Sequence, residues 1–186
     1  MSQPPHLSRR RFLRQACSIT LAGSLPVLSA PALAGLRLPE RTVTLDHTHT
    51  LERIHLIYAQ GDQYLPPALG RLNTFLRDHY SGSIGHMDPT LYDLLTRIRN
   101  QFKVEQPFQI ISGYRDPDTN ERLRTTRGGG VAKHSLHMDG KALDIRLPGV
   151  PLDELRDAAL SLKAGGVGYY PHEQFVHIDT GRVRHW

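Results

Sequence analysis

Two histidines and an aspartate with metal-ligand chemistry lie in two short motifs of this sequence. His137 and Asp144 belong to the segment SLHMDGKALD (135–144), and His177 follows in FVHID (175–179). Zinc takes imidazole nitrogens and carboxylate oxygens as ligands, and its catalytic sites use three protein ligands with the fourth position left to water. The residue types and their spacing therefore predict a catalytic zinc site.

Two strands and one turn are expected to position these side chains. Gly140 lets the backbone fold back after the first histidine, and the apolar run 142–147 is typical of a strand that carries Asp144. The alternating run 175–178 predicts a second strand, which carries the last ligand. A chain with eleven histidines also contains such pairs by chance, as hydrogen-bonded structural residues. The motifs around the three residues distinguish the two interpretations.

Four segments extend the pattern beyond the three ligands. They are SGYR (112–115), SLHMDGKALD (135–144), GGVGYYP (165–171) and FVHIDTG (175–181). In order and spacing they resemble the zinc murein peptidases related to the D-alanyl-D-alanine metallopeptidases, and most closely the MepK-type murein endopeptidases. The resemblance continues to Arg184-His185-Trp186. It implies that the three residues are zinc ligands, that the fold is hedgehog/D-alanyl-D-alanine-peptidase-like, and that peptidoglycan peptide cross-links are the substrate.

Arg115 matches the arginine of the family's SGYR segment. The resemblance implies that it lies near the metal and neutralises a developing oxyanion or a substrate carboxylate, which a permanently charged guanidinium can do. The alternative is a surface arginine beside Asp116 and Asp118. Ser135 is expected to hold the substrate, to orient its loop or only to cap the turn.

The general base is the one residue that the resemblance does not supply. Many D-alanyl-D-alanine metallopeptidases have a glutamate three residues before the last histidine ligand, where this chain has Gln174, which cannot take up a proton. Glu173 would point to the opposite face of a strand from Gln174. Asp179 lies two residues after His177, hence on the same face, and is expected either to activate water or to hold the His177 tautomer. Histidines that could act instead are His185 first, then His134 and His172.

The first 34 residues have the pattern of an export signal. Arg9-Arg10 precedes a moderately apolar stretch (16–28), and small residues follow at 32–34. The stretch is shorter than the ~20 residues of a transmembrane helix. We therefore predict a twin-arginine signal peptide at 1–34 and a single exported domain at 35–186, located in the periplasm without stable membrane insertion.

Removal of this leader changes the charge argument. It holds four arginines and no acidic residue, so the formal charge falls from +5 to +1. The sequence pI of about 9.6 is then no argument for a nucleic-acid partner. The only cysteine, Cys17, also lies in the leader, which excludes disulfides and thiolate zinc ligands from the remaining domain. A cysteine-free domain suits an oxidising compartment.

Strands and helices alternate without a βαβ rhythm, which predicts an α+β fold with an antiparallel sheet and flanking helices. The expected elements are a hairpin (41–45 and 53–58), a helix at 66–80, a helix at 89–102 capped by Asp88, a strand at 107–112, and a helix at 151–163 ended by Gly165-Gly166. The polar segment 116–127 predicts one or two helical turns. The glycines at 128–130 predict a flexible loop, which is either a lid or a connector. His47, His49 and His55 are assigned to the scaffold.

Three functional hypotheses follow from these residues. The first is a zinc endopeptidase that hydrolyses murein peptide cross-links, with the diaminopimelate-to-diaminopimelate bond implied by the resemblance. The second is a D,D- or L,D-carboxypeptidase that trims stem peptides. The third is an inactive, metal-bearing peptidoglycan-binding module, which the missing glutamate leaves open. Split dimers, shortened stems or unchanged muropeptides would distinguish the three.

Overall fold

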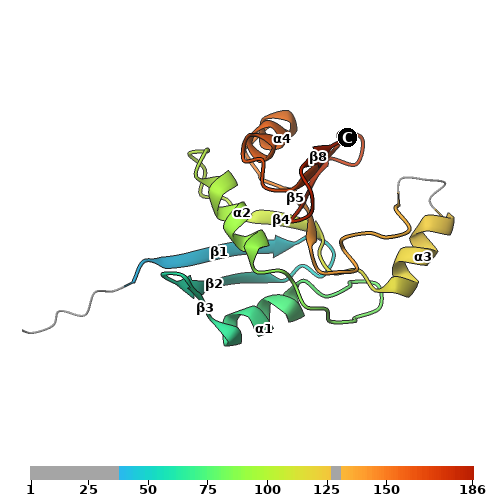
Figure 1. Cartoon of the computed structure of the whole chain (residues 1–186), viewed down its shortest axis with the longest axis horizontal. Helices are drawn as coiled ribbons and strands as arrows, with labels where there is room; N and C mark the ends of the chain where they lie inside the picture. The colour runs from blue at the N-terminus through green and yellow to red at the C-terminus, as the bar shows by residue number, and fades with distance from the viewer. Residues whose placement is uncertain (1–37, 127–130) are drawn as a thin grey trace, which may run out of the picture. The chain divides into compact units, whose positions relative to one another are not determined.

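A single eight-stranded sheet organises the residues that the computed structural model describes, 38–126 and 131–186 (Figure 1). The strands are β1 (Glu40–His47), β2 (Arg53–Gln60), β3 (Gln63–Tyr64), β4 (Phe108–Ser112), β5 (Ala142–Arg146), β6 (Gly166–Tyr170), β7 (Phe175–Asp179) and β8 (Arg184–His185). The helices are α1 (Pro66–Phe75), α2 (Thr90–Arg99), α3 (Pro117–Thr126) and α4 (Leu152–Ser161). The predicted leader and the glycines at 128–130 lie outside the described residues.

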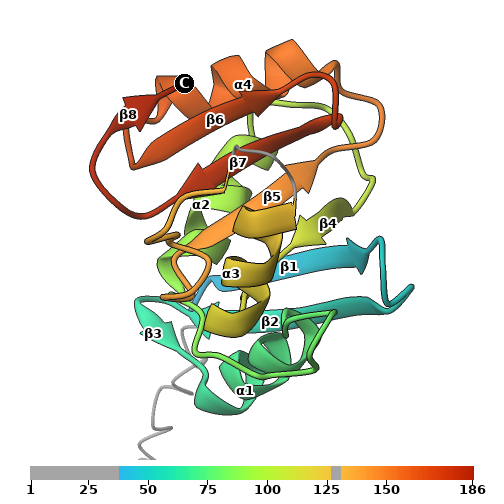
Figure 2. The ribbon, with the colours of Figure 1, turned by 90° about the vertical axis from the view of Figure 1, so that its right-hand side faces the viewer.

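The strand order is β3-β2-β1-β4-β5-β7-β6-β8, which Figure 2 shows face on. The β1–β2 hairpin and the α+β class agree with the prediction. The prediction of an antiparallel sheet is wrong at two places, because β1 pairs in parallel with β4 and β6 pairs in parallel with β8. A parallel pair needs a long return connection. Two helices and two strands lie between β1 and β4 in the chain, and β7 lies between β6 and β8.

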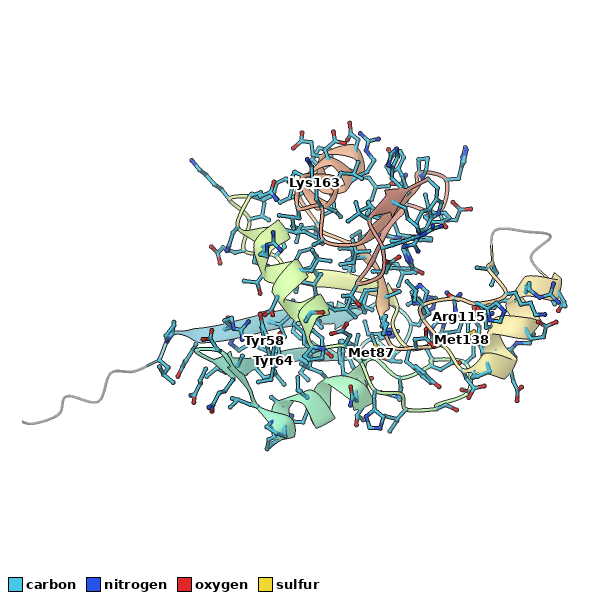
Figure 3. All side chains as sticks on the ribbon, viewed as in Figure 1. Tyr58, Tyr64, Met87, Arg115, Met138 and Lys163 are labelled. Carbon is cyan, nitrogen blue, oxygen red and sulfur yellow. The ribbon has the colours of Figure 1, made fainter. Side chains whose placement is uncertain are left out.

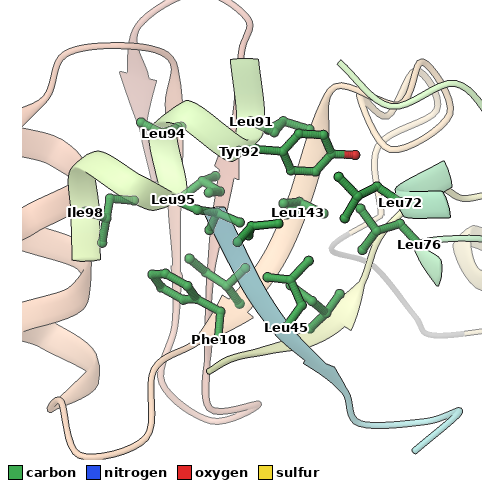
Figure 4. Packing of buried hydrophobic residues seen from close by; sticks show 14 of the residues in the cluster. Leu45, Leu72, Leu76, Leu91, Tyr92, Leu94, Leu95, Ile98, Phe108 and Leu143 are labelled. Atoms are coloured by element: carbon green, nitrogen blue, oxygen red, sulfur yellow. The ribbon is translucent and has the colours of Figure 1, made fainter. Parts of the chain in front are cut away.

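The core forms where α2 packs against the sheet. Leu91, Leu94, Leu95 and Ile98 recur at helical spacing and are all buried, as the sequence predicts. In Figure 4 they lie over apolar side chains of the strands, among them Leu45, Phe108 and Leu143. Helix α4 packs beside α2, against β6 and β7. Figures 1 and 2 place α3 on the other side of the sheet, in front of β5.

Local side-chain hydrogen bonds decide where two helices begin and end. The predicted helix 66–80 ends at Phe75, because the Asp78 carboxylate accepts hydrogen bonds from the backbone N–H groups of Tyr80 (2.8 Å) and Ser81 (3.4 Å) and so forms a turn. Helix α2 starts at Thr90, and Asp88 Oδ1 accepts from its N–H at 3.0 Å. The helix therefore begins one residue later than predicted, with Pro89 rather than Asp88 at the N-cap position, although the Asp88 side chain still binds its first N–H group.

Two further helices differ from the prediction, one in its length and the other in the residue that follows its end. Helix α3 has ten residues, more than the expected one or two turns, and an ion pair between Glu121 and Arg124 (2.6 Å) lies along it. Helix α4 ends at Ser161, and the left-handed residue after it is Lys163 (φ 48°). Neither Gly165 nor Gly166 has a positive φ, so the prediction that they cap this helix is wrong.

Candidate metal centre

Neighbouring strands align the predicted ligands in one row across the sheet. Asp144 on β5 is directly opposite His177 on β7, and Ser112 on β4 is opposite Asp144. On the far side of β7, Gly168 of β6 is opposite His177. Residues paired across adjacent strands present their side chains on the same face. The row therefore brings a carboxylate and an imidazole side by side, with a glycine next to them.

The third residue, His137, reaches this row from a tight turn. Backbone hydrogen bonds close the turn, including Gly140 N–H to His137 O (3.2 Å) and Lys141 N–H to Leu136 O (2.8 Å). Gly140 has φ +66°, and a Cβ there would lie 1.9 Å from His86 O, so this position requires glycine. The prediction of a turn before strand β5 is confirmed.

The SGYR segment fixes His137 from two sides. Its imidazole Nδ1 lies 2.7 Å from the carbonyl oxygen of Gly113, and its own carbonyl oxygen accepts the N–H of Arg115 at 3.1 Å. Figure 3 places Arg115 beside this turn, near Met138. The two motifs thus meet at His137.

Three ligand atoms converge at the end of this arrangement. His137 Nε2 lies 3.2 Å from Asp144 Oδ1 and 3.2 Å from His177 Nδ1, and the last two atoms are 2.9 Å apart. All three residues are buried. Among the described residues they form the one group of three acidic, histidine or cysteine side chains close enough to hold a metal ion.

The hydrogen bonds behind the two imidazoles determine their tautomers. Gly113 O can only accept, so His137 Nδ1 carries the proton and Nε2 presents a lone pair. On His177, Nε2 lies 3.1 Å from the Asp179 carboxylate and donates to it, so Nδ1 is the nitrogen that presents a lone pair when the ring is neutral. With both imidazoles neutral, two lone pairs and a carboxylate oxygen would face one another, and a proton on His177 or a cation relieves their repulsion.

The pKa values of these groups follow from the same contacts. Burial disfavours the charged form of His177, but hydrogen bonds to Asp144 and Asp179 outweigh it and raise its pKa to about 9. Burial lowers the pKa of His137. Burial acts to raise the pKa of Asp144, yet its bonds to the two histidines hold that pKa well below its usual range. The cluster thus keeps an anionic oxygen beside two nitrogens, which is the charge pattern that a divalent cation requires.

The geometry fits zinc. Two nitrogen ligands at 2.0–2.1 Å from a tetrahedral ion lie about 3.3 Å apart, close to the 3.2 Å between His137 Nε2 and His177 Nδ1. Zinc-bound histidines usually donate their other N–H to a carbonyl or a carboxylate. Gly113 O and Asp179 occupy these two positions here.

Arg115 lies beside the cluster, where the sequence predicts it. Its Nη2 is 3.8 Å from Asp144 Oδ2 and 3.4 Å from Ser112 Oγ, and its side chain is largely buried. A guanidinium so placed brings a fixed positive charge next to the ligand carboxylate. Ser135 lines the same cavity, and its Oγ accepts the N–H of His137 at 3.4 Å, as expected of a turn cap.

Asp179 is enclosed by hydrogen-bond donors. Besides His177, it accepts bonds from the backbone N–H groups of Gly166 (2.9 Å) and Gly181 (2.8 Å) and from Arg184 (2.7 and 3.1 Å). It has no exposed surface, and it is not among the residues that line the cavity. Of the two roles that the sequence leaves open, this geometry favours holding the His177 tautomer over activating water.

The three ligands open into a cavity of about 280 Å³ with two walls. One wall comes from the β1–β2 turn and the segment after α1, and includes His49, His79 and Tyr80. The opposite wall comes from the β6–β7–β8 end of the sheet: Tyr170, Glu173, Phe175, Arg184 and Trp186.

The β6–β7 connection overturns one expectation about the base. Residues 171–174 form a turn, not a strand, and Gln174 has φ +60° with its side-chain amide donating to Pro171 O. Glu173 lines the cavity, so the alternation argument that set it aside does not apply. The proline in GGVGYYP was the sequence signal for this turn.

The histidines considered as a general base also differ in whether they line the cavity. His134 lines the cavity, whereas His185 is exposed on β8 and, like His172, is not among the lining residues. The structure therefore does not bring His185 to the predicted ligands.

Three other imidazoles form a separate cluster. The rings of His49 and His79 stack at 4.1 Å, and buried His47 lies 5.7 Å from His79, measured between ring centroids. Burial lowers the pKa of both His47 and His79 to about 4. The scaffold role predicted for His47 agrees with its Nδ1, which accepts the backbone N–H of His49 at 3.2 Å. His49, by contrast, belongs to the cavity wall.

Comparisons with known proteins give one consistent result. A family model described as peptidoglycan L,D-endopeptidase MepK matches residues 37–186. The chain is 47% identical over 180 residues to "Peptidoglycan L,D-endopeptidase MepK" of Escherichia coli (strain K12), covering 96% of this chain and 97% of that protein. It is 36% identical over 168 residues to the "Probable peptidoglycan L,D-endopeptidase MepK" of Haemophilus influenzae, covering 89% and 90% of the two chains.

Proposed function

The chain belongs to the family of the peptidoglycan L,D-endopeptidase MepK, and from this premise we propose that it hydrolyses peptide cross-links of peptidoglycan. The bond that we assign is the diaminopimelate-to-diaminopimelate bridge. One observation of the structure carries the proposal: three potential ligand atoms, from His137, Asp144 and His177, lie within 3.2 Å of one another in an open cavity. We extend the proposal to a hedgehog/D-alanyl-D-alanine-peptidase-like fold, which the mixed sheet with four helices supports.

We assign zinc to this cluster, with His137 Nε2, Asp144 Oδ1 and His177 Nδ1 as its ligands. Zinc in such a site acts as a Lewis acid and makes water a competent nucleophile near neutral pH. Two nitrogen ligands and one carboxylate match catalytic zinc sites, which keep one position open. The described residues of the chain offer no cysteine for a closed structural site, because Cys17 lies in the predicted leader.

Arg115 is assigned to charge stabilisation. Its guanidinium lines the cavity and lies 3.8 Å from Asp144 Oδ2. Hydrolysis of an amide places negative charge on the carbonyl oxygen, and a fixed cation aimed at that oxygen stabilises the transition state. The free carboxylates of a murein cross-link are a second group that the same guanidinium can bind.

Proton transfer is assigned to Glu173. A general base must reach the water that it activates. Asp179 is fully buried and hydrogen-bonded to four donor groups, whereas Glu173 lines the cavity. A carboxylate on the wall can take the proton of the attacking water and give it to the leaving amine. Asp179 instead keeps the His177 proton on Nε2, so that Nδ1 remains free to bind metal.

Residues 1–34 are proposed to direct export by the twin-arginine route, with the domain acting in the periplasm. Support comes from the order of the Arg9-Arg10 pair, the apolar stretch and the small residues in the sequence. In the part of the chain that the structure describes, no helix is long and apolar enough to cross a bilayer.

The test is mass spectrometry of purified cross-linked muropeptides after incubation with the protein and zinc. The proposal expects dimers to be split at the bridge between the stems. Shortened stems without split dimers would instead identify a carboxypeptidase, and unchanged muropeptides would identify a binding module. His137→Ala in the same assay is the control for a contaminating hydrolase.

A further inference from the structure

Trp186 packs against a predicted metal ligand. The centroid of its indole lies 5.3 Å from that of the His177 imidazole, at an interplanar angle of 49°. Trp186 also lines the cavity and is half exposed. The ring therefore covers the outer side of His177, whose side chain remains only 10% exposed.

Contacts of Trp186 close a cycle around this histidine. His177 Nε2 bonds to Asp179, Asp179 bonds to Arg184 at 2.7 Å, and the Arg184 guanidinium lies over the Trp186 ring, 4.9 Å from its centroid. The fourth contact is the one between Trp186 and His177. Since each member touches two others, the imidazole is held both at its Nε2 atom and on its ring surface.

The backbone and one side chain of the sheet fix the indole itself. Trp186 O accepts the N–H of Tyr169 at 3.0 Å, and Trp186 N–H donates to Val167 O at 3.3 Å. Its indole Nε1–H donates to the hydroxyl of Tyr170 at 2.7 Å. Two backbone bonds thus hold the residue against the sheet, and one side-chain bond orients its ring.

Two glycines of the GGVG segment leave the space for this cycle. A Cβ at Gly168 would lie 2.7 Å from the Trp186 ring, and a Cβ at Gly166 would lie 2.4 Å from both Asp179 Oδ2 and Arg184 Nη1. Any larger residue at these two positions would displace the ring or the ion pair. These two glycines therefore leave the space that the side chains around His177 occupy.

We propose that Trp186 is a positioning residue of the metal centre, which holds the His177 imidazole in its ligand orientation and shields the His177–Asp179 hydrogen bond from water. A hydrogen bond shielded from water is electrostatically stronger. Partners that orient a metal-bound histidine typically change metal affinity by about 10–100-fold when removed. The inference rests on the zinc site of the proposed function, but it concerns binding rather than hydrolysis.

The experiment measures zinc affinity by chelator competition for the full chain and its variants. Trp186→Ala is expected to weaken zinc binding by about tenfold, with turnover restored by excess zinc. Trp186→Phe keeps a ring against His177 and should recover part of the loss. Val183→Ala is the matched control, because Val183 is an exposed residue of the same segment and does not line the cavity.

The chain contains one tryptophan, so its fluorescence reports on this site alone. Zinc titration should change the Trp186 emission of the wild-type chain with saturation near one equivalent. Gly168→Ala, which retains the tryptophan but forces the ring to move, should shift the emission of the zinc-free chain and weaken zinc binding like Trp186→Ala.

Three results would overturn the inference. These are wild-type zinc affinity in Trp186→Ala, an equal loss of affinity in Val183→Ala, and wild-type affinity in Gly168→Ala whether or not its emission has shifted. If Trp186→Ala does not fold, the Gly168→Ala measurement decides. A wild-type chain that binds no zinc would instead refute the proposed metal, which separates the two failures.

Discussion

Replacement of Asp179 by asparagine should reverse the tautomer of His177. Asp179 Oδ1 accepts the N–H groups of Gly166 and Gly181, and an asparagine oxygen can keep both bonds. Its amide nitrogen would then occupy the position of Oδ2, which now accepts from Arg184 Nη2 at 2.7 Å and faces His177 Nε2 at 3.1 Å. An amide nitrogen only donates. His177 would therefore present a lone pair at Nε2 and carry its proton on Nδ1, the atom that we assign to the metal.

The magnitude follows from the role of this contact. The pKa of Asp179 is held well below its usual range, because four donors outweigh the effect of burial, so the wild-type residue is a carboxylate. Loss of a carboxylate that orients a metal-bound histidine weakens metal binding by about 10–100-fold. This corresponds to about 1.4–2.7 kcal/mol of binding free energy. Turnover should fall at limiting zinc and return when zinc is in excess.

The assay compares the zinc dissociation constant with the cleavage rate at limiting and excess zinc. Asp93→Asn is the matched control, since Asp93 is also a carboxylate paired with an arginine, Arg41, and hydrogen-bonded to two tyrosines, but does not line the cavity. It should lower stability without changing zinc affinity. A wild-type zinc affinity in Asp179→Asn together with an approximately 100-fold loss of turnover would refute the reasoning, because it would mean that Asp179 acts on water.

Four further predictions test other parts of the site and the chain. His137→Ala should lose zinc and activity together, and stoichiometric zinc retained in that variant, measured by elemental analysis, would contradict the ligand set. Glu173→Gln should lower turnover by about 100-fold at unchanged zinc affinity, and wild-type turnover would redirect the search to His134. The double variant Arg9→Lys, Arg10→Lys should leave precursor in the cytoplasm in cell fractionation, and normal periplasmic accumulation would indicate another export route. Burial lowers the pKa of His47 from 6.5 to about 4, so the unfolded chain binds the proton more readily. The free energy of unfolding should therefore fall as the pH drops from 6.5 towards 4. In urea unfolding at pH 7 and pH 5, His47→Asn should weaken this pH dependence, and an unchanged dependence would exclude His47 as its source.

The sequence predicted the parts of the site that depend on local pattern. His137 required a turn with glycine, Asp144 and His177 required alternating strands, and each of these follows from neighbours within a few residues. The order in which the strands pair is set by long-range packing. Parallel pairing of β1 with β4 has no local signal, and for that reason the antiparallel sheet was predicted wrongly.

The glycines of GGVGYYP illustrate a limit of a different kind. A Gly-Gly pair after a helix favours a left-handed cap, yet Lys163 takes that conformation. Gly166 and Gly168 instead lie where Asp179, Arg184 and Trp186 leave no room for a Cβ. The backbone conformation of a glycine can be argued from its neighbours in the chain. Whether a side chain would fit at its position depends on residues that the fold brings there from elsewhere in the sequence.

The base shows how one wrong local assumption propagates. If 173–177 were one strand, Glu173 and Gln174 would lie on opposite faces, and the Glu173 carboxylate would point away from the site. In the structure the strand begins only at Phe175, and the positive φ of Gln174 turns the chain so that Glu173 reaches the cavity wall. In the function that we propose, Glu173 supplies the carboxylate one residue before the position of Gln174, and the turn accounts for this shift in sequence.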